Sequence, residues 1–327
     1  MPTRQDVASK AGVSGATVSR VYNTPALVDA ATREKVRAAA AELGFVPDRH
    51  ASALRRKTSN TLLLVEIEGS ETYRWPGQRA YQSLYGEIIR SLVPHLQTTA
   101  WHLRLVTLPS PSQISSLADL PDFAGILGFD VNTQEVATAL ASLGKPVVCA
   151  HHGDHLLGVS TVTTDNRAGG GLQARWLQSR KLKNVAYLTG LSEDVRSHHL
   201  RQKGFLEVLP KATLLESGVG LAEGRAAATQ VARLARHKGL QAVACVNDLT
   251  ALGLIQGLAR EGVRVPQDLT VVGYDNLVLT EVHEAGLPTV EAHLPKLYIT
   301  ALDALIRRVQ GNLQEIHEVL APEFVSG

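Results

Sequence analysis

At 327 residues the chain is too long for one compact core, which predicts two or three domains. A hydrophobic content of 44% excludes a disordered chain, and no apolar run approaches the roughly 20 residues that a membrane helix needs. The polar N-terminus carries no signal peptide, so we expect a soluble cytoplasmic protein without a membrane partner. Residues 1–60 hold ten Lys or Arg against five Asp or Glu, whereas the remainder holds 23 against 26. A basic head on an acidic body is typical of a nucleic-acid-binding module carried by a larger unit.

The first 23 residues predict two short helices joined by a glycine turn. Apolar residues recur at helical spacing on both sides of Gly12, so both helices can share one small core. Ser14 is placed to cap the second helix. The outward positions of that helix carry short side chains and one arginine: Gly15, Ala16, Ser19 and Arg20. Such a surface can enter the major groove of DNA, and the basic head favours this helix-turn-helix interpretation over an ordinary helical hairpin.

A third helix is expected from Ala31 to Leu43, where apolar residues form one stripe and Gly44 follows. Pro47 marks a stop, since proline disfavours helical geometry at the residue before it. Residues 48–57 form a short, basic, helix-compatible stretch with too few apolar groups to be stable alone. That stretch is either a linker or a segment that folds against a partner.

From Asn60 onward, strand-like runs alternate with helical runs. Strands are expected at residues 61–67, 102–108, 125–128, 146–150, 184–189, 242–246 and 269–274. Helices are expected at residues 83–96, 133–143, 166–178, 204–209, 222–237 and 249–261. This alternation predicts parallel sheets covered on both faces, and the number of strands predicts two α/β subdomains. Ligands of such folds bind at the carboxyl ends of the strands, which here means the cleft between the subdomains.

The reactive side chains of the body predict neither catalysis nor a metal site. Cys149 and Cys245 lie in apolar strand-like runs and are expected to be buried thiols of a reducing compartment. Histidines gather at residues 151–155 and 198–199, but without the spacing of a metal site. Residues 169–171 are glycines at a helix start that lacks the lysine and serine of a phosphate-binding loop. No nucleophile–base pair or carboxylate pair stands out, so we expect no enzyme and no cofactor.

Motifs spread along nearly the whole chain resemble the lactose-repressor (LacI/GalR) family of bacterial transcription regulators. In the head they are residues 6–8 (DVA), 11–14 (AGVS), 16–21 (ATVSRV) and Asn23, followed by 43–47 (LGFVP). In the body they are 165–169 (DNRAG), 204–205 (GF), 247–248 (ND), 264–266 (RVP), 271–275 (VVGYD) and 288–290 (PTV). Because these motifs follow one another in the family's order, the resemblance extends to the whole architecture.

The resemblance implies an all-α helix-turn-helix head, a hinge helix and a periplasmic-binding-protein-like core of two α/β subdomains with parallel sheets. The expected bounds are 1–46 for the head, 47–60 for the hinge and 61–327 for the core, whose subdomains comprise about 61–159 plus 291–327 and about 160–290. The resemblance also implies homodimers on palindromic double-stranded operator DNA and a small effector between the subdomains. No leucine heptads occur near the C-terminus, which favours a dimer over a tetramer.

The resemblance assigns DNA contacts to the head and the hinge. Arg20 matches the family's base-contacting arginine, and Gly15 and Ala16 match positions that set operator preference, where Ala16 can offer a methyl group to thymine. Leu54 matches the leucine that wedges between base steps in the minor groove, and a lone apolar contact in a linker is the alternative. The other expected contacts, to the DNA backbone or in the hinge, are Arg4, Ser14, Thr17, Ser19, Asn23, Arg49, Ala51 and Arg55.

The effector cleft departs from the family in two places. The family's cleft arginine, expected five residues before Gly204, is replaced by His199, so Arg196 or Arg201 substitutes for it or the effector differs. Where the family has an Asn-Pro-Phe-Phe-like segment, residues 70–77 read SETYRWPG, whose aromatic residues either stack on a sugar face or form a surface lid. The expected effector set is Tyr73, Trp75, His151, His199, Arg196, Asn247 and Asp275.

Asn247 and Asp275 follow predicted strands and match effector-contacting positions of the family. Their alternative role is that of local caps, with Asp248 competing as the cap of the next helix. Together these expectations describe a sequence-specific transcriptional regulator, most simply a repressor, that a sugar or related metabolite switches. The alternative is a small-solute-binding sensory module without specific operator binding, against which the hinge motif argues.

Overall fold

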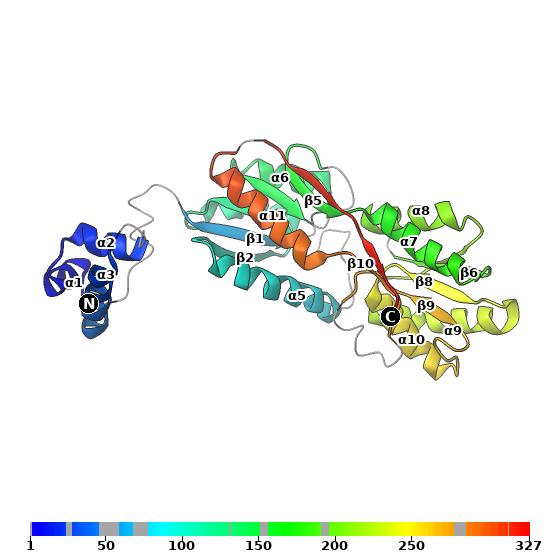
Figure 1. Cartoon of the computed structure of the whole chain (residues 1–327). Coiled ribbons are helices and arrows are strands. Elements are labelled where there is room, and N and C mark those ends of the chain that lie inside the picture. Colours follow the sequence, from blue (N-terminus) through cyan, green and yellow to red (C-terminus); the bar gives the residue numbers. More distant parts are fainter. Residues whose placement is uncertain are drawn as a thin grey trace. The chain divides into compact units, whose positions relative to one another are not determined.

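The computed structural model describes residues 2–23, 28–45, 59–67, 78–129, 131, 133–150, 156–190, 196–277, 286–312 and 314–327. Contacts between Cα atoms divide the chain into two compact units, Met1–Ser59 and Asn60–Gly327. Figure 1 shows the first unit as a small helical bundle and the second as a larger body of sheets and helices. Each unit is described below by itself.

The described residues of the first unit form three helices, α1 (Arg4–Ala11), α2 (Gly15–Asn23) and α3 (Ala30–Leu43). α1 begins with a capping box, in which the Thr3 N–H donates to the Asp6 carboxylate at 2.7 Å and the Asp6 N–H donates to the Thr3 hydroxyl at 3.3 Å. Gly12 ends α1 in the left-handed conformation, with φ of 67°. The apolar stripes of the three helices meet in one small core of Val7, Ala8, Val18, Val21, Val36, Ala39 and Ala40. The expected helix-turn-helix is thus confirmed.

The first sheet of the body has six strands in the order β11-β5-β4-β3-β1-β2, and all its pairs are parallel. They are β1 (Thr61–Ile67), β2 (His102–Leu108), β3 (Gly125–Phe129), β4 (Val147–Ala150), β5 (Ser160–Thr164) and β11 (His317–Leu320). Alternate residues of β1 face opposite layers: Leu62 and Leu64 pack toward α5 and α11, whereas Leu63 and Val65 pack toward α6 and a 3-10 helix. These covering helices are α5 (Gln78–Gln97), α6 (Gln134–Ala141), α11 (Leu294–Val309) and the 3-10 helix Pro111–Asp119.

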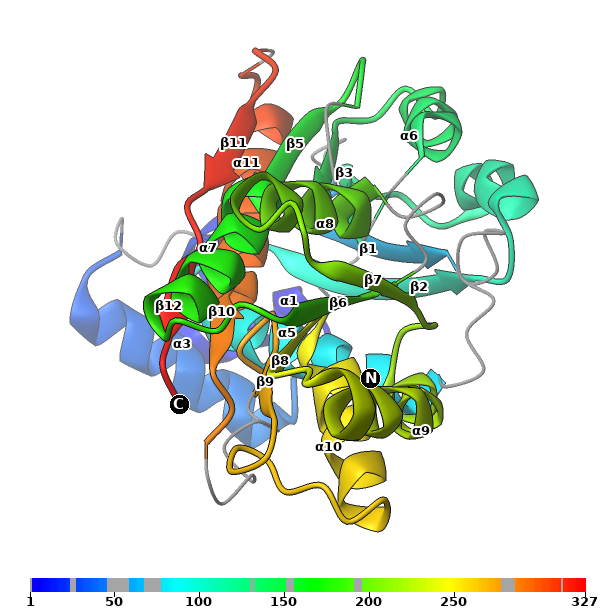
Figure 2. The ribbon, with the colours of Figure 1, turned by 90° about the vertical axis from the view of Figure 1, so that its right-hand side faces the viewer.

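The second sheet has four parallel strands in the order β7-β6-β8-β9. They are β6 (Val185–Thr189), β7 (Thr213–Glu216), β8 (Ala242–Cys245) and β9 (Thr270–Val272). α7 (Asn166–Ser179) and α8 (Arg196–Val208) cover one face, and α9 (Leu221–Lys238) and α10 (Asp248–Arg260) cover the other, as Figure 2 shows. The expected pair of α/β subdomains with parallel sheets is therefore confirmed.

Both cysteines are free thiols buried in these sheets, as expected. Burial raises the pKa of the Cys149 thiol to about 12 and also raises the pKa of Cys245. Neither sulfur is therefore a thiolate at neutral pH, and both act as small apolar side chains.

The helix pairs of the second sheet approach each other through glycines. A Cβ added at Gly204 of α8 would lie 1.8 Å from the Arg167 carbonyl oxygen of α7, and one at Gly170 would lie 1.8 Å from the Arg201 carbonyl oxygen. On the opposite face, a Cβ at Gly253 of α10 would lie 2.3 Å from a backbone oxygen of α9. Gly170, the middle residue of the run at 169–171, therefore serves close packing of α7 on α8.

A short antiparallel pair, β10 (Thr289–Glu291) and β12 (Glu323–Val325), carries the chain between the two sheets. The Gly273 N–H donates to the Pro288 carbonyl and the Asp275 N–H donates to the Val290 carbonyl, both at 2.8 Å, so the segment after β9 runs alongside β10. β10 then leads directly into α11 of the first sheet. This crossover joins the second sheet to the first.

The structure differs from the expected elements in three respects. β5 belongs to the first sheet, so the chain leaves that sheet at Asp165 and not at about residue 160. The sequence of β5, STVTT, is too polar to predict a buried strand. The helix expected at 204–209 begins earlier, at Arg196. Its first half is polar and so lacks the apolar pattern that predicts a helix. Five further elements were not predicted from the sequence: the helix α11 and the strands β7, β10, β11 and β12. The four strands are very short or exposed.

Candidate functional site

The exposed surface of α2 in the first unit matches the expected groove-facing side of the head. Ala16 and Arg20 are exposed, whereas Gly15, Thr17 and Ser19 are half-buried. Ser14 caps the helix as expected: its hydroxyl accepts from the Thr17 N–H at 3.1 Å and lies 2.9 Å from the Thr17 hydroxyl. This bond holds both hydroxyls at the first turn of α2, where helix N–H groups point outward and favour a phosphate.

A hollow of about 390 Å³ lies between α2 and the start of α3. It is lined by Val13, Ser14, Thr17, Arg20, Val28, Asp29 and Thr32. Asp29 is the N-cap of α3, and its carboxylate accepts from the Thr32 N–H at 2.9 Å. Arg4 of α1 approaches the same helix start, since a Cβ on Gly15 would lie 3.6 Å from its Nε. Arg4, Ser14, Thr17 and Arg20 therefore share one face of the first unit.

The other expected DNA contacts fall outside the described side chains. They are Asn23, whose backbone alone is described, and the hinge residues Arg49, Ala51, Leu54 and Arg55. Their roles remain predictions.

In the body, a polar cluster centred on Arg201 lies at the carboxyl ends of β8 and β9. Arg201 is only 2% exposed. Its Nη2 lies 3.2 Å from Oδ1 of Asp275, its Nε donates to Oδ1 of Asn166 at 2.9 Å, and its Nη1 donates to the Val246 carbonyl at 2.9 Å. The guanidinium also stacks on the Tyr274 ring, 3.7 Å from the ring centroid. A buried charge is stable only with such pairing, so this site is built around the arginine.

Gly169 makes room for the Tyr274 ring. A Cβ at Gly169 would lie 2.1 Å from the Tyr274 hydroxyl oxygen, so only glycine at the start of α7 allows the ring to lie beneath Arg201. Burial raises the pKa of Tyr274, which keeps the phenol neutral. The tyrosine therefore supplies an uncharged aromatic floor for the guanidinium.

Asn247 has the capping role considered as its alternative, whereas Asp248, the competing candidate, does not cap the helix. The Asn247 side chain caps α10 by accepting from the Thr250 N–H at 2.9 Å. Asp248 is fully buried and accepts from the Leu277 N–H at 2.9 Å and from the Thr289 hydroxyl at 2.6 Å. Burial, and then the charge of Asp275, raise the pKa of Asp248 well above its ordinary value. Asp248 therefore ties the segment after β9 to β10.

The structure brings together only part of the expected effector set. Asp275 lies in the cluster and Asn247 lies beside it, where β8 ends. Arg196 and His199 are exposed on α8, whereas Arg201 is buried in the cluster. Positions 199 and 201 point to nearly opposite sides of a helix, which turns 100° per residue, and Arg201 lies one turn before the packing glycine Gly204. That spacing is the signal that would have selected Arg201.

Tyr73, Trp75 and His151 lie outside the described residues, so their effector roles stay predictions. Among the described residues, no three His, Cys, Asp or Glu side chains gather as a metal ion would require. None of the described helices is long and apolar enough to cross a membrane.

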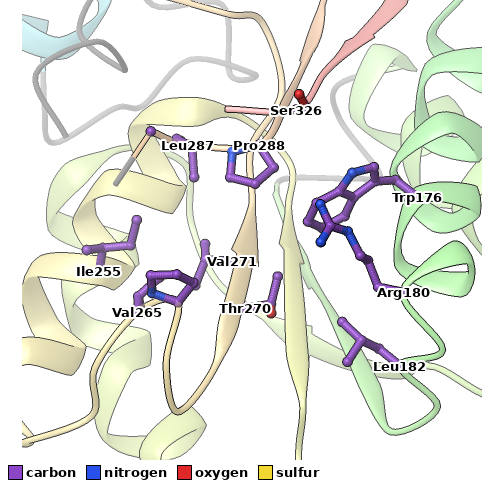
Figure 3. A pocket seen from close by; sticks show the side chains of 12 residues that line it. Trp176, Arg180, Leu182, Ile255, Val265, Thr270, Val271, Leu287, Pro288 and Ser326 are labelled. Carbon is purple, nitrogen blue, oxygen red and sulfur yellow. The ribbon is translucent and has the colours of Figure 1, made fainter. Parts of the chain in front are cut away.

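The body also has a hollow of about 360 Å³, which Figure 3 shows beside the edge strand β9. Its walls include Trp176 and Arg180 of α7, Ile255 of α10 and the segment Leu287–Pro288. The Arg180 guanidinium stacks on Trp176, whose other neighbour is the Phe324 ring at 5.2 Å. Neither Arg201 nor Asp275 lines this hollow, which is separate from the polar cluster.

Comparison with known proteins agrees with both parts of this description. The sequence pattern of the lacI family of bacterial regulatory proteins matches residues 3–48, and that of the periplasmic binding protein-like domain matches residues 174–327. The HTH-type transcriptional repressor PurR of Vibrio cholerae serotype O1 (strain M66-2) is 28% identical over 330 residues, covering 96% of this chain and 94% of its own. The HTH-type transcriptional repressor CytR of Escherichia coli (strain K12) is 28% identical over 332 residues, covering 94% and 90%.

Solved structures share the fold over the full length. A lac repressor dimer bound to operator and the anti-inducer ONPF gives a TM-score of 0.76 at 24% identity, covering 99% of this chain and 98% of its own. A CelR transcriptional regulator in complex with cellobiose gives a TM-score of 0.70 at 27% identity, covering all of both chains. The head, the paired α/β subdomains and the relatives lead to one conclusion: this chain joins a lacI-family helix-turn-helix domain at residues 3–48 to a periplasmic-binding-protein-like domain at residues 174–327, and so resembles the DNA-binding transcriptional repressors to which it is similar.

Proposed function

We propose that the protein works in the cytoplasm as a homodimeric repressor, binds a palindromic operator through residues 1–59, and is switched by a small uncharged metabolite at the Arg201 cluster. The observation that carries this proposal is the buried Arg201–Asp275 pair at the carboxyl ends of β8 and β9, where ligands of parallel α/β sheets bind. Among the similar proteins, the CelR regulator in complex with cellobiose supports a ligand from the sugars or their relatives.

The charges of the cluster favour an uncharged ligand. Arg201 and Asp275 neutralise each other and are both buried, so an added charge would lack a counterion. A sugar or nucleoside hydroxyl can instead donate to the Asp275 carboxylate and accept from the Arg201 guanidinium. A hydroxyl-rich neutral ligand therefore suits this pair.

On DNA, the exposed Arg20 suits a bidentate contact to guanine, and Ala16 suits a thymine methyl group. Gly15 and Ala16 have short side chains, so the direct readout of bases by these two positions is limited. Specificity therefore also rests on half-site spacing and on the Leu54 wedge in the hinge, which stays a prediction. A dimer is supported by neighbouring exposed apolar side chains on the first sheet's layer, Val93 of α5 at 47% and Leu105 of the edge strand β2 at 48%.

The test begins with selection of duplexes from a random DNA library by the full chain at one fixed salt concentration. We expect a palindrome whose binding is lost when residues 1–58 are deleted, while sedimentation shows that the remaining body is a folded dimer. Specific DNA binding by the truncated body, or no sequence preference of the full chain, would contradict the assignment. In the second case the protein would be a solute-binding sensory module.

The effector site is tested by thermal shift with a panel of sugars and nucleosides. A compound that raises the melting temperature of the natural chain is expected to leave Arg201→Gln unshifted and to shift Arg175→Gln normally, since Arg175 is an exposed arginine of the neighbouring α7. Equal shifts in both variants would place the ligand elsewhere.

A further inference from the structure

Three residues other than glycine adopt the left-handed conformation around the crossover between the two sheets. Asp275 and Asn276, just after β9, have φ of 110° and 54°, and His293, just before α11, has φ of 54°. Such conformations are unfavourable for residues with a Cβ and persist only where the surroundings impose them. The crossover is therefore held by something beyond its own backbone preference.

The carboxylate of Glu291 in β10 joins the two left-handed segments. Its Oε2 accepts from the Asn276 side-chain amide at 2.5 Å, and its Oε1 accepts from the His293 backbone N–H at 2.7 Å. The backbone adds a bridge between Asp275 and Glu291, in which the Asp275 N–H donates to the Val290 carbonyl at 2.8 Å. The half-buried Glu291 side chain thus holds both Asn276, next to Asp275, and His293, which precedes α11.

This arrangement places Glu291 between the Arg201 cluster at the second sheet and the start of α11, which packs on the first sheet. On one side, Asp275 faces Arg201 at 3.2 Å. On the other side, His293 leads into α11, whose apolar face packs on the first sheet. The only other carboxylate near the His293 ring among the described residues is the exposed Glu323, 3.6 Å from its Nε2. A change at Asp275 can therefore reach α11 through the two hydrogen bonds of the Glu291 carboxylate, alongside the backbone pairing with β10.

We propose that Glu291 is a positioning residue that couples the Arg201–Asp275 pair to the start of α11. The proposal takes that pair as the effector site proposed above. A ligand that draws on Asp275 alters the left-handed segment at 275–276, and the Glu291 carboxylate passes the change to His293 and hence to the first sheet. An effector shifts the equilibrium between two arrangements only through such a differential contact.

Two substitutions separate this role from a merely structural one. Glu291→Ala removes both bonds. Glu291→Gln keeps both, because its Oε1 still accepts from His293 while its Nε2 donates to a rotated Asn276 amide. The matched control is Glu323→Ala, which removes the carboxylate on the other side of His293. If Glu291 couples the two sites, Gln restores the linkage that Ala abolishes.

The first measurement needs no ligand and no DNA. Hydrogen–deuterium exchange of residues 289–297 is followed in the full chain, with Arg201→Gln as the perturbation of the effector pair. Measured relative to the exchange of β3, which reports global unfolding, we expect Arg201→Gln to speed exchange there about five-fold in the natural, Glu291→Gln and Glu323→Ala backgrounds, and to add nothing beyond the change in β3 in the Glu291→Ala background. An equal increase in the Glu291→Ala background, or no increase in the natural one, overturns the proposal.

The second measurement tests the regulatory consequence. The selected operator duplex is titrated with each variant, with and without the sugar or nucleoside that shifts the melting temperature. Glu291→Ala is expected to bind that compound while its operator affinity no longer responds, and Glu291→Gln is expected to respond within about two-fold of the natural chain. A full response in Glu291→Ala refutes the proposal. If no compound of the panel binds, the proposed effector function fails, and the exchange experiment alone decides the linkage.

Discussion

At the scale of single residues, the buried Arg201 guanidinium has the most demanding surroundings in the body. Four groups from three parts of the chain meet it: a carboxylate and an aromatic ring after β9, a side-chain amide of α7 and a backbone carbonyl after β8. Each of these groups would be costly to bury alone, and together they satisfy one another. Specific folding of the second sheet and the ligand recognition proposed for this cluster therefore depend on the same side chain.

Arg201→Gln is expected to lower the free energy of unfolding by about 3–5 kcal/mol, because it leaves the buried Asp275 without its partner. Urea unfolding of the full chain measures this loss. The double variant Arg201→Met with Asp275→Leu should recover most of it, since neither charge then remains buried. Unchanged stability of the single variant would show that the pair is solvated.

Gly169→Ala is expected to destabilise the body by about 1–3 kcal/mol, because its Cβ collides with the Tyr274 hydroxyl and displaces the ring from Arg201. Gly171→Ala is the control on the same helix: its Cβ would meet only the flexible end of Arg175 at 2.9 Å. Thermal unfolding of both variants makes the comparison. Equal losses would mean that backbone packing of the helix, not the ring, dominates at position 169.

At the scale of elements, close helix pairs determine how the second sheet is covered. α7 and α8 approach each other so closely that carbonyl oxygens occupy the space of two absent Cβ atoms. Such contacts bring α8 near enough for Arg201 to reach Asn166 on α7. The geometry of the cluster is therefore a consequence of helix packing as well as of its own hydrogen bonds.

Gly204→Ala is expected to destabilise the protein by about 1–3 kcal/mol and to weaken ligand binding, because α8 must move away from α7. Gly86→Ala on α5 is the matched control, since nothing lies within 4 Å of its added Cβ. That control should be neutral or more stable by up to about 1 kcal/mol, as alanine favours a helix. A stable Gly204→Ala variant with unchanged ligand binding would contradict the packing argument.

Two helix caps give the head a predictable response to pH. Bonds from the Thr3 and Thr32 backbone N–H groups lower the pKa values of Asp6 and Asp29 below their ordinary value of 3.8. Their contribution to stability is therefore complete above pH 3.8 and is lost as the pH falls through the lower, folded-state pKa values.

Amide exchange in α3, corrected for the intrinsic effect of pH, is expected to accelerate as the pH falls from about 5 to about 2.5. Asp29→Asn should remove that pH dependence from α3 and leave it in α1, where Asp6 still titrates. A steep dependence that persists in α3 of this variant would assign the effect to another group.

The sequence predicted the elements with strong periodicity and missed those whose pattern depends on tertiary context. The helix-turn-helix, the strands β1 to β4 and the helices α7, α9 and α10 carry apolar periods that burial alone explains. β5 is a buried strand of mostly threonine and serine, and its place is set by pairing with β4 and β11 from distant parts of the chain. No local pattern contains that information.

Like the fold, the candidate site could be predicted from the sequence only in part. Asp275 and Asn247 follow apolar strands, so their position at the strand ends is readable from the sequence. Arg201 lies within a polar run of α8, where the choice between it, Arg196 and His199 depends on which side of the helix faces α7. The close approach at Gly204 decides that choice, and its one trace in the sequence is the spacing of one helix turn between Arg201 and Gly204.

At the scale of the whole molecule, the chain combines a DNA-reading unit with a body that we propose to dimerise through its first sheet. The exposed edge strand β2 presents Leu105, and an edge strand with apolar residues is a ready surface for a second copy. The second sheet also has an exposed edge leucine, Leu214 of β7, at 43%. The two edges therefore allow a matched comparison.

Leu105→Lys is expected to convert the dimer into folded monomers and to weaken operator binding at least about ten-fold, since a monomer reaches only one half-site. Leu214→Lys should sediment as the dimer and bind DNA normally. Sedimentation velocity and a DNA titration on both variants provide the test. A dimeric Leu105→Lys variant, or a monomeric Leu214→Lys variant, would move the interface to another surface.

The strand order of the first sheet has a consequence for synthesis on the ribosome. The four strands of the second sheet and their four helices come from one continuous stretch, from Asn166 to Val272. The first sheet begins earlier, yet β11 at its edge and α11 over its apolar face are translated almost last. The second sheet can therefore complete its fold first. Meanwhile β1, β3 and β4 have left the ribosome, but the face that α11 covers in the folded protein is still without α11. During translation, that uncovered face is where a chaperone would bind the nascent chain.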